Sequence, residues 1–199
     1  MAHQARTFFG PGDLIDRGRI AAAVREIIDA IGEDPEREGL AETPRRIAEM
    51  YGELFAGLCQ DPREVLDGGF SDVSEDVVIL RDIPFYSLCE HHFLPFYGSA
   101  HVGYIPNGRL VGISKIARAL DILAKRPQVQ ERLTRQMADA ILEALDADGV
   151  AVVLEAEHLC LSMRGARKPG SRVITSAVRG AFARSGVSRG EFLALVQGS

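Results

Sequence analysis

The chain has 199 residues, of which 46% are hydrophobic and 26% charged, ordinary proportions for a globular protein that buries a core. A largely disordered chain is therefore excluded, and no apolar run reaches the roughly 18–20 residues of a membrane-spanning helix. The formal net charge of −5 disfavours nucleic acid as a partner, because a phosphate backbone needs a basic surface. We expect neither nucleic acid nor membrane as a partner and, without a signal-peptide core or a disulfide framework, a cytoplasmic location.

Two helices are predicted near the N-terminus, after a flexible arm of residues 1–13. Apolar residues recur at helical spacing over 14–31, and Thr43-Pro44 is a typical helix start because proline is tolerated in the first turn. Helical periodicity continues after this dipeptide, and residues 60–72 are rich in turn formers. These patterns predict an N-terminal helical region over residues 14–72.

Residues 73–199 form the second predicted region, in which strands and helices follow each other without regular alternation. Strands are predicted over 77–80, 96–105, 110–113 and 150–163, and helices after Ser114, from Pro127 and over 192–196. Asn107-Gly108 predicts a hairpin between the second and third of these strands. The order is typical of an α+β fold rather than of a parallel βαβ sheet.

Histidines and cysteines gather in two short stretches of this region. Cys89 and His92 have a spacing that suits two ligands from one turn, with His91 between them, while His158 and Cys160 lie two apart on a predicted strand and would face the same side. Thiolates combined with imidazoles favour zinc. Four ligands would make a closed structural site, and three would leave a position for water in a catalytic site. The residues alone leave both alternatives open.

Two further residues of these types lie apart from the cluster. Cys59 follows a predicted helix and is expected to be an ordinary buried thiol. His101 lies on the polar side of its predicted strand, where a solvated or hydrogen-bonded side chain is expected.

Positive charge is concentrated in one part of this acidic chain. Between His158 and Glu191 there is no acidic residue, but there are seven basic ones: Arg164, Arg167, Lys168, Arg172, Arg179, Arg184 and Arg189. Lys115 and Arg118 add a second basic group at a predicted helix start. Such groups bind phosphates or cover a solvated surface. Beside a candidate metal site, they favour a small anionic substrate.

Gln130 and Glu131 lie at the start of the second long helix of this region. Glutamate is favourable in a first helical turn, which explains its presence without any function. An amide next to a carboxylate also has the donors and acceptors to bind the edge of a purine.

Several of these stretches, taken in order, resemble the GTP cyclohydrolase I family. The matching segments are Asp34–Leu40 with Thr43-Pro-Arg-Arg46, Ser87-Leu-Cys-Glu-His-His-Phe-Leu-Pro95, Gly103–Pro106, Gly112–Arg118, Arg126-Pro-Gln-Val-Gln-Glu-Arg-Leu133 and Glu157-His-Leu-Cys-Leu-Ser-Met-Arg-Gly165. The resemblance implies a tunnelling fold, with antiparallel strands and paired helices assembled as a toroidal homodecamer of two pentamers. It also implies conversion of GTP and water to 7,8-dihydroneopterin triphosphate and formate, the first step toward tetrahydrofolate-type pterins.

The resemblance further implies a role for each matching residue. Cys89, His92 and Cys160 match the zinc ligands; His91, His158 and Ser114 match catalytic residues; Gln130 and Glu131 match the guanine-binding pair; and Lys115, Arg118, Arg164 and Arg46 match triphosphate contacts. His158 is expected to protonate N7 of guanine, and His91 and Ser114 to assist ribose opening and ring closure. Two rival hypotheses are a binding module with a structural zinc site and a related enzyme that acts on another purine or pterin.

Overall fold

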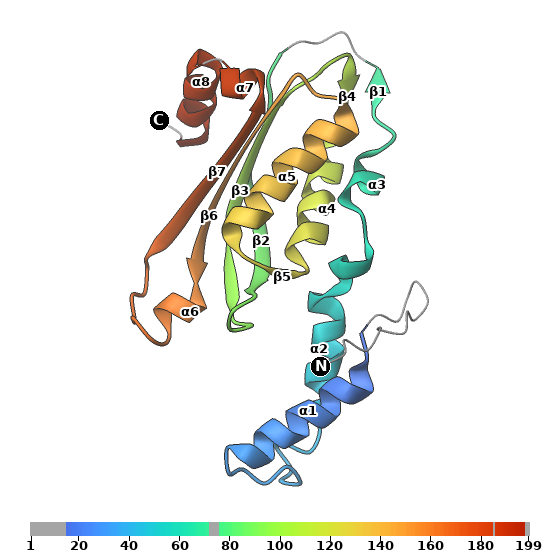
Figure 1. Cartoon of the computed structure of the whole chain (residues 1–199), viewed down its shortest axis with the longest axis vertical. Coiled ribbons are helices and arrows are strands. Elements are labelled where there is room, and N and C mark those ends of the chain that lie inside the picture. The colour runs from blue at the N-terminus through green and yellow to red at the C-terminus, as the bar shows by residue number, and fades with distance from the viewer. Residues whose placement is uncertain (1–14, 72–75, 185, 198–199) are drawn as a thin grey trace, which may run out of the picture. The chain divides into compact units, whose positions relative to one another are not determined.

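The computed structural model describes residues 15–71, 76–184 and 186–197, so the expected arm of residues 1–13 lies outside the described residues. The helices are α1 (Arg17–Ala30), α2 (Thr43–Leu54), the 3₁₀ helix η1 (Ala56–Cys59), α3 (Pro62–Leu66), α4 (Ile113–Ala124), α5 (Gln130–Leu145), α6 (Leu159–Ser162), α7 (Ala181–Arg184) and α8 (Gly186–Gln197) (Figure 1). The strands are β1 (Phe70–Ser71), β2 (Val78–Cys89), β3 (Pro95–Ile105), β4 (Arg109–Leu110), β5 (Pro127–Gln128), β6 (Gly149–His158) and β7 (Arg172–Gly180). The α+β composition expected from the sequence is confirmed.

The chain divides into two compact units, and the boundary between them in the sequence falls between Cys59 and Gln60. In the first unit, α1 and α2 pack against each other through buried Val24, Ile28 and Ala48. Asp16 caps α1 by accepting a hydrogen bond from the backbone of Arg19 at 2.9 Å. Both helices agree with the predicted periodicity, because apolar residues at helical spacing form one buried face.

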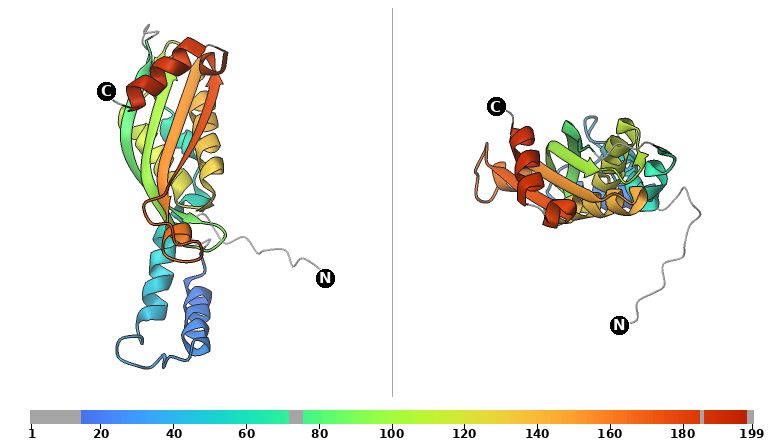
Figure 2. Two further views of the ribbon diagram at one scale, coloured as in Figure 1. Left: turned by 90° about the vertical axis from the view of Figure 1, so that its left-hand side faces the viewer. Right: turned by 90° about the horizontal axis from the view of Figure 1, so that it is seen from above.

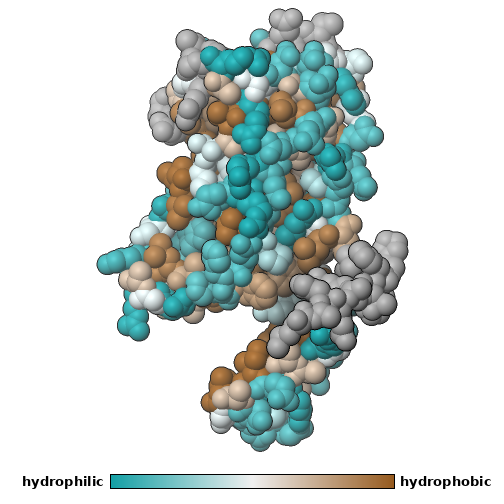
Figure 3. Space-filling view, viewed as in Figure 1, coloured by the Kyte–Doolittle hydropathy of each residue, from teal (hydrophilic) through white to brown (hydrophobic). Residues whose placement is uncertain are grey.

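Some apolar side chains of the first unit remain at its surface, as Figure 3 shows by hydropathy. Ile27 of α1 and Ile31, which caps the C-terminal end of this helix, are 59% and 71% exposed. These two side chains lie four residues apart and leave a small apolar area at the C-terminal end of α1.

The second unit is built on a five-stranded sheet with the strand order β5-β2-β3-β6-β7. All neighbours pair antiparallel except β2 and β5, which are parallel, and β1 and β4 form a separate two-stranded sheet. Helices α4 and α5 cover one face, whereas α7 and α8 lie over the other (Figures 1 and 2). Among the described residues, no helix has the length and apolar character to cross a membrane.

Strand β6 lies between β3 and β7 and contributes to the apolar packing on both faces. Val150, Val152 and Leu154 are fully buried in the main core under α4 and α5. Ala151 and Val153 alternate with them and pack under α7 and α8. This explains the nearly continuous apolar run in the sequence, because a strand covered on both sides has no polar face.

The predicted hairpin between strands 96–105 and 110–113 is wrong. β4 pairs with β1, with Phe70 opposite Leu110, and α4 begins at Ile113. The reason is that β3 is hydrogen-bonded on both sides, to β2 and to β6, and has no free edge for a third partner. Gly108 still adopts the positive φ of 71° expected at a turn.

Two predicted helix starts also need correction. Gly112, not Ser114, is the N-cap of α4, so Ser114 lies inside the first turn. The segment from Pro127 begins as strand β5 rather than as a helix, because Gln128 pairs with Cys89 of β2 and its carbonyl accepts from the backbone N–H of Glu90 at 2.9 Å. The helix α5 then begins at Gln130.

The boundary between the compact units differs from the predicted division at residue 72. Helix α3 belongs to the second unit, where it packs against α4 and α5. Its Leu66 is fully buried in the main core, and Arg63 reaches Glu143 of α5 at 3.2 Å. Part of the turn-rich segment therefore completes the core of the second unit.

Candidate metal and nucleotide site

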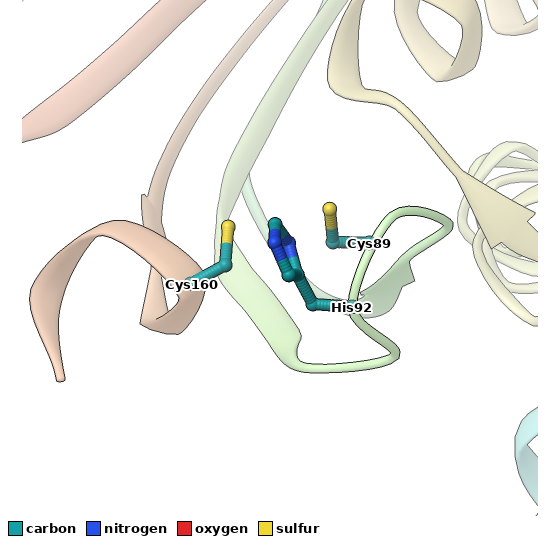
Figure 4. Close-up of side chains that lie close together, drawn as sticks. All are labelled: Cys89, His92 and Cys160. Carbon is teal, nitrogen blue, oxygen red and sulfur yellow. The ribbon is translucent and has the colours of Figure 1, made fainter. Parts of the chain in front are cut away.

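Three side chains from separate elements converge at one end of the sheet (Figure 4). Cys89 ends β2, His92 lies in the turn that joins β2 to β3, and Cys160 comes from α6. Their ligand atoms all lie within 4.8 Å of one another. The turn is tight, since the backbone N–H groups of His92 and Phe93 both donate to the carbonyl of Cys89, at 3.3 and 2.8 Å. One ion fits this donor set, and two thiolates with an imidazole favour zinc.

Cys160 reaches this cluster by a route that differs from the prediction. The predicted strand over 150–163 is wrong beyond His158, where α6 begins and carries Cys160. Strand β3 begins at Pro95 and β7 at Arg172, so no backbone partner remains for β6 after this point. Burial raises the pKa of the Cys160 thiol, and the neighbouring Cys89 raises it further. The raised pKa favours the protonated thiol. A bound metal cation would favour the thiolate instead, because a coordinating thiol is deprotonated.

His158 lies at the end of β6 and is not part of the three-residue cluster. Its ring stacks on the buried ring of Phe96, with the centroids 4.7 Å apart and the planes 5° from parallel. Its Nε2 lies 2.7 Å from Oε1 of Gln130. Burial lowers the pKa of His158, and the negative charge of Glu131 acts in the opposite direction.

Gln130 is almost fully buried, and its side chain is held by several partners besides His158. Its Nε2 lies within hydrogen-bonding distance of the carbonyls of Leu154 and Val173 and of the hydroxyl of Thr175. Sequence reasoning assigned Gln130 to a purine edge and missed Thr175. No local signal marks these partners, because they lie 24 or more residues away in the chain.

Glu90 and His91 lie within the turn, between Cys89 and His92. Nδ1 of His91 lies 3.7 Å from Sγ of Cys89, and the histidine is exposed. Glu90 accepts two hydrogen bonds from the guanidinium of Arg132 on α5, at 2.5 and 3.0 Å, which lowers the pKa of this carboxyl group. Arg132 therefore ties the turn to the helix that begins with Gln130, a connection that the sequence did not reveal.

The residues expected at the phosphate groups of a nucleotide lie elsewhere in the same unit. Ser114, Lys115 and Arg118 occupy the start of α4, where the ammonium group of Lys115 donates to the backbone carbonyl of Asp67. The other end of α4 lies beside β2, where the carbonyl of Ala124 accepts from the Ser87 hydroxyl at 2.7 Å. Ten residues of helix separate the two ends by about 15 Å. Within one chain, α4 therefore does not bring this basic group to the cysteines.

The other two predicted phosphate contacts are exposed. Arg164 follows α6 directly, close in sequence to Cys160. Arg46 lies on α2 in the first unit, and its guanidinium makes no hydrogen bond or ion pair with a residue that the structure describes. The adjacent Arg45 is bound instead by Glu42 and Glu49, at 2.8 and 2.6 Å. The arginine favoured from the sequence is thus the unengaged one of the pair.

The predictions for Cys59 and His101, the two residues apart from the cluster, differ in their agreement with the structure. The prediction that Cys59 is buried is wrong: it ends the short helix η1, and its side chain is exposed. His101 is hydrogen-bonded as expected, because its Nδ1 accepts from the backbone N–H of Asp82 at 3.3 Å. It is also 8% exposed, so burial lowers its pKa.

An α+β fold with a Cys-His-Cys cluster and an adjacent histidine outside it defines a metal-binding protein of enzymatic type. The family model of GTP cyclohydrolase I matches residues 20–197, and the chain belongs to this family.

Curated relatives agree with this assignment. A GTP cyclohydrolase 1 of Dehalococcoides mccartyi is 61% identical, with 92% of this chain and 98% of the relative covered. Those of Carboxydothermus hydrogenoformans and Corynebacterium glutamicum are 59% and 58% identical, covering 92% of this chain and 96% and 94% of the relatives. The apo crystal structure of an archaeosine synthase, QueF-Like, is similar over 54% of this chain and 97% of its own, with 21% identity and a TM-score of 0.44.

Proposed function

We propose that this chain converts GTP and water to 7,8-dihydroneopterin triphosphate and formate, the first step of tetrahydrofolate-type pterin synthesis. Its family membership makes it a hydrolase that acts on GTP. The main observation in support of this reaction is that His158 is not one of the three clustered residues, so its imidazole is not needed as a metal ligand. A histidine that binds Gln130 beside three metal-binding residues is suited to proton transfer.

Cys89, His92 and Cys160 are proposed to hold a zinc ion. Their donor atoms suit a zinc ion, since they are mutually close, come from three separate elements and combine the soft and borderline ligands that zinc prefers. A zinc ion bound by three protein ligands supplies a Lewis acid that activates water at neutral pH.

His158 is proposed to donate a proton to N7 of the purine. Loss of electron density from the five-membered ring then makes C8 more electrophilic, so that water adds there and formate leaves. His91, exposed beside Cys89, is proposed to move protons during ribose opening and ring closure together with Ser114. An imidazole suits both tasks because one ring nitrogen can release a proton while the other keeps its own.

Guanine recognition is proposed for Glu131, whose carboxylate would accept from N1–H and the 2-amino group. Adenine lacks both donors, which explains a preference for guanine. Glu131 is exposed and follows Gln130 at the start of α5, beside His158. Gln130 was expected to share this contact with guanine, but its side chain is already hydrogen-bonded to other residues of the chain. We propose that Gln130 acts on the substrate indirectly, through its contact with His158.

The triphosphate is proposed to bind Lys115, Arg118, Arg164 and Arg46. The start of α4 and the metal-binding residues lie at opposite ends of that helix, which supports a site completed by a neighbouring subunit. We propose a homodecamer of two pentamers with a tunnelling fold, located in the cytoplasm. The exposed apolar area at the C-terminal end of α1 supports assembly. Light scattering that found a fully active monomer would contradict this proposal.

The activity is tested by incubating zinc-loaded protein with GTP, oxidising the products, and measuring neopterin fluorescence and formate. His158→Ala should retain zinc and lose turnover by about 100-fold or more. Cys160→Ser should lose the zinc itself, while Cys59→Ser, which alters an exposed thiol outside the cluster, should change neither. If His158→Ala loses zinc together with its fold, the site is structural and the enzymatic proposal fails.

A further inference from the structure

Both polar atoms of the buried Gln130 side chain have hydrogen-bond partners among the described residues. Two of the three groups around its Nε2 are backbone carbonyls, those of Leu154 at 3.1 Å and Val173 at 2.9 Å. Because carbonyl oxygens only accept, the atom that faces them must be the amide nitrogen. The amide oxygen Oε1 is therefore the atom that faces His158, at 2.7 Å.

This orientation determines where His158 carries its proton. An amide oxygen has no hydrogen to donate, so Nε2 of His158 must be the donor in this contact. The neutral ring is then the Nε2–H tautomer, and its lone pair lies on Nδ1. Among the described residues, no hydrogen bond to this Nδ1 is present, which leaves it available to a bound molecule.

Two threonines hold the amide in this orientation. Thr134 Oγ1 donates its single hydrogen to the backbone carbonyl of Gln130 at 2.7 Å. The hydroxyl of Thr175, 2.6 Å from Thr134 Oγ1, must therefore be the donor between the two threonines. Thr175 Oγ1 in turn accepts from Nε2 of Gln130 at 3.1 Å, and because this nitrogen has two hydrogens for three acceptors, one hydrogen is shared between two of them. The hydrogen bonds form a closed ring in which every donor points the same way around. Rotation of the amide by 180° would place an oxygen where a donor is needed and break the ring.

We propose that Gln130 is a positioning residue that fixes the His158 tautomer, so that Nδ1 exchanges the proton with the purine. When the doubly protonated ring gives its Nδ1 proton to N7, it is left as the Nε2–H form that Gln130 stabilises. The stacked ring of Phe96 holds the imidazole plane while this occurs. The inference rests on the proposed function of His158 and adds the identity of the reacting nitrogen.

The direct test is nitrogen NMR of the zinc-loaded protein containing ¹⁵N-imidazole histidine, at alkaline pH where the neutral ring dominates. The His158 signals, identified by their loss in His158→Ala, should show a protonated Nε2 and an unprotonated Nδ1. A protonated Nδ1 would overturn the proposal. This measurement needs no turnover, so its failure is distinguishable from a failure of the proposed activity.

The kinetic test compares two identical substitutions on α5. Gln130→Met should keep zinc, lose the tautomer signature, and lower kcat by about 10- to 100-fold with little change in the KM for GTP. Gln136→Met is the matched control and should leave kcat unchanged, since the Gln136 side chain bonds only to Gln128 among the described residues. An increase in KM at constant kcat would indicate that Gln130 contacts guanine directly, and would overturn the proposal.

Discussion

The ring of hydrogen bonds through Thr134 and Thr175 leads to a prediction about stability that a double-mutant cycle can test. Valine has nearly the shape of threonine, so replacing either residue removes a hydroxyl without opening a cavity. Thr134→Val leaves the Thr175 hydroxyl without its acceptor, and Thr175→Val leaves Thr134 Oγ1 without its donor. Thr134 is 1% exposed, so water does not readily replace the lost partner.

Each single substitution should cost about 1–3 kcal/mol, the range for leaving a buried polar group without its partner. Replacing both removes the orphaned groups together and should cost less than the sum, by about 1 kcal/mol or more. Gln130 keeps its two carbonyl acceptors in all three variants, so the rest of the network remains satisfied.

The assay is thermal unfolding of the four proteins at one protein concentration, with zinc present. A cost of 1 kcal/mol corresponds to a decrease in Tm of about 2–4 °C for a chain of this length. If the decrease for the double variant equals the sum of the two single decreases, the hydroxyls act independently and the reasoning about a closed ring is refuted.

Three further predictions concern the sheet and the metal-binding turn. Gly98→Ala should lower stability by more than about 3 kcal/mol, because a Cβ would lie 1.9 Å from the carbonyl oxygen of Glu155; in contrast, Gly190→Ala in α8 meets nothing within 4 Å and should be neutral or stabilising in the same melting assay. Glu90→Gln should accelerate zinc release to a chromogenic chelator, because the ionic contact between Glu90 and Arg132 is weakened. Exchange of the two residues, with Arg at position 90 and Glu at position 132, should restore slow release. Equal rates in all three proteins would show that this ion pair does not hold the turn. Dialysis against a strong chelator should lower Tm and abolish turnover, and added zinc should restore both, whereas an unchanged Tm would show that no metal stabilises the fold.

The sequence predicted best what depends on local periodicity. The helices α1 and α2 follow from apolar spacing, because one face of each helix is buried and leaves a regular pattern. The hairpin at Asn107-Gly108 failed because pairing depends on which strand edges are free, and β3 has none. Local turn chemistry carries no information about that competition.

The candidate site shows the same limit. The spacing of Cys89 and His92 predicted a shared turn, because a few residues determine it. The grouping of Cys160 with them is also found, although the strand on which it was placed ends two residues earlier. The ring around Gln130 had no counterpart in the sequence, since its members become neighbours only when α5 packs on β6 and β7.

The distance between the two ends of α4 has a consequence for genetics as well as for catalysis. If each site combines the cysteines of one subunit with the α4 start of the next, His158→Ala and Lys115→Ala damage different halves of it. Subunits carrying one defect each would then form some intact sites when they assemble together. Two inactive alleles of this gene should thus complement each other in one cell, which two alleles that both alter the metal cluster should not do.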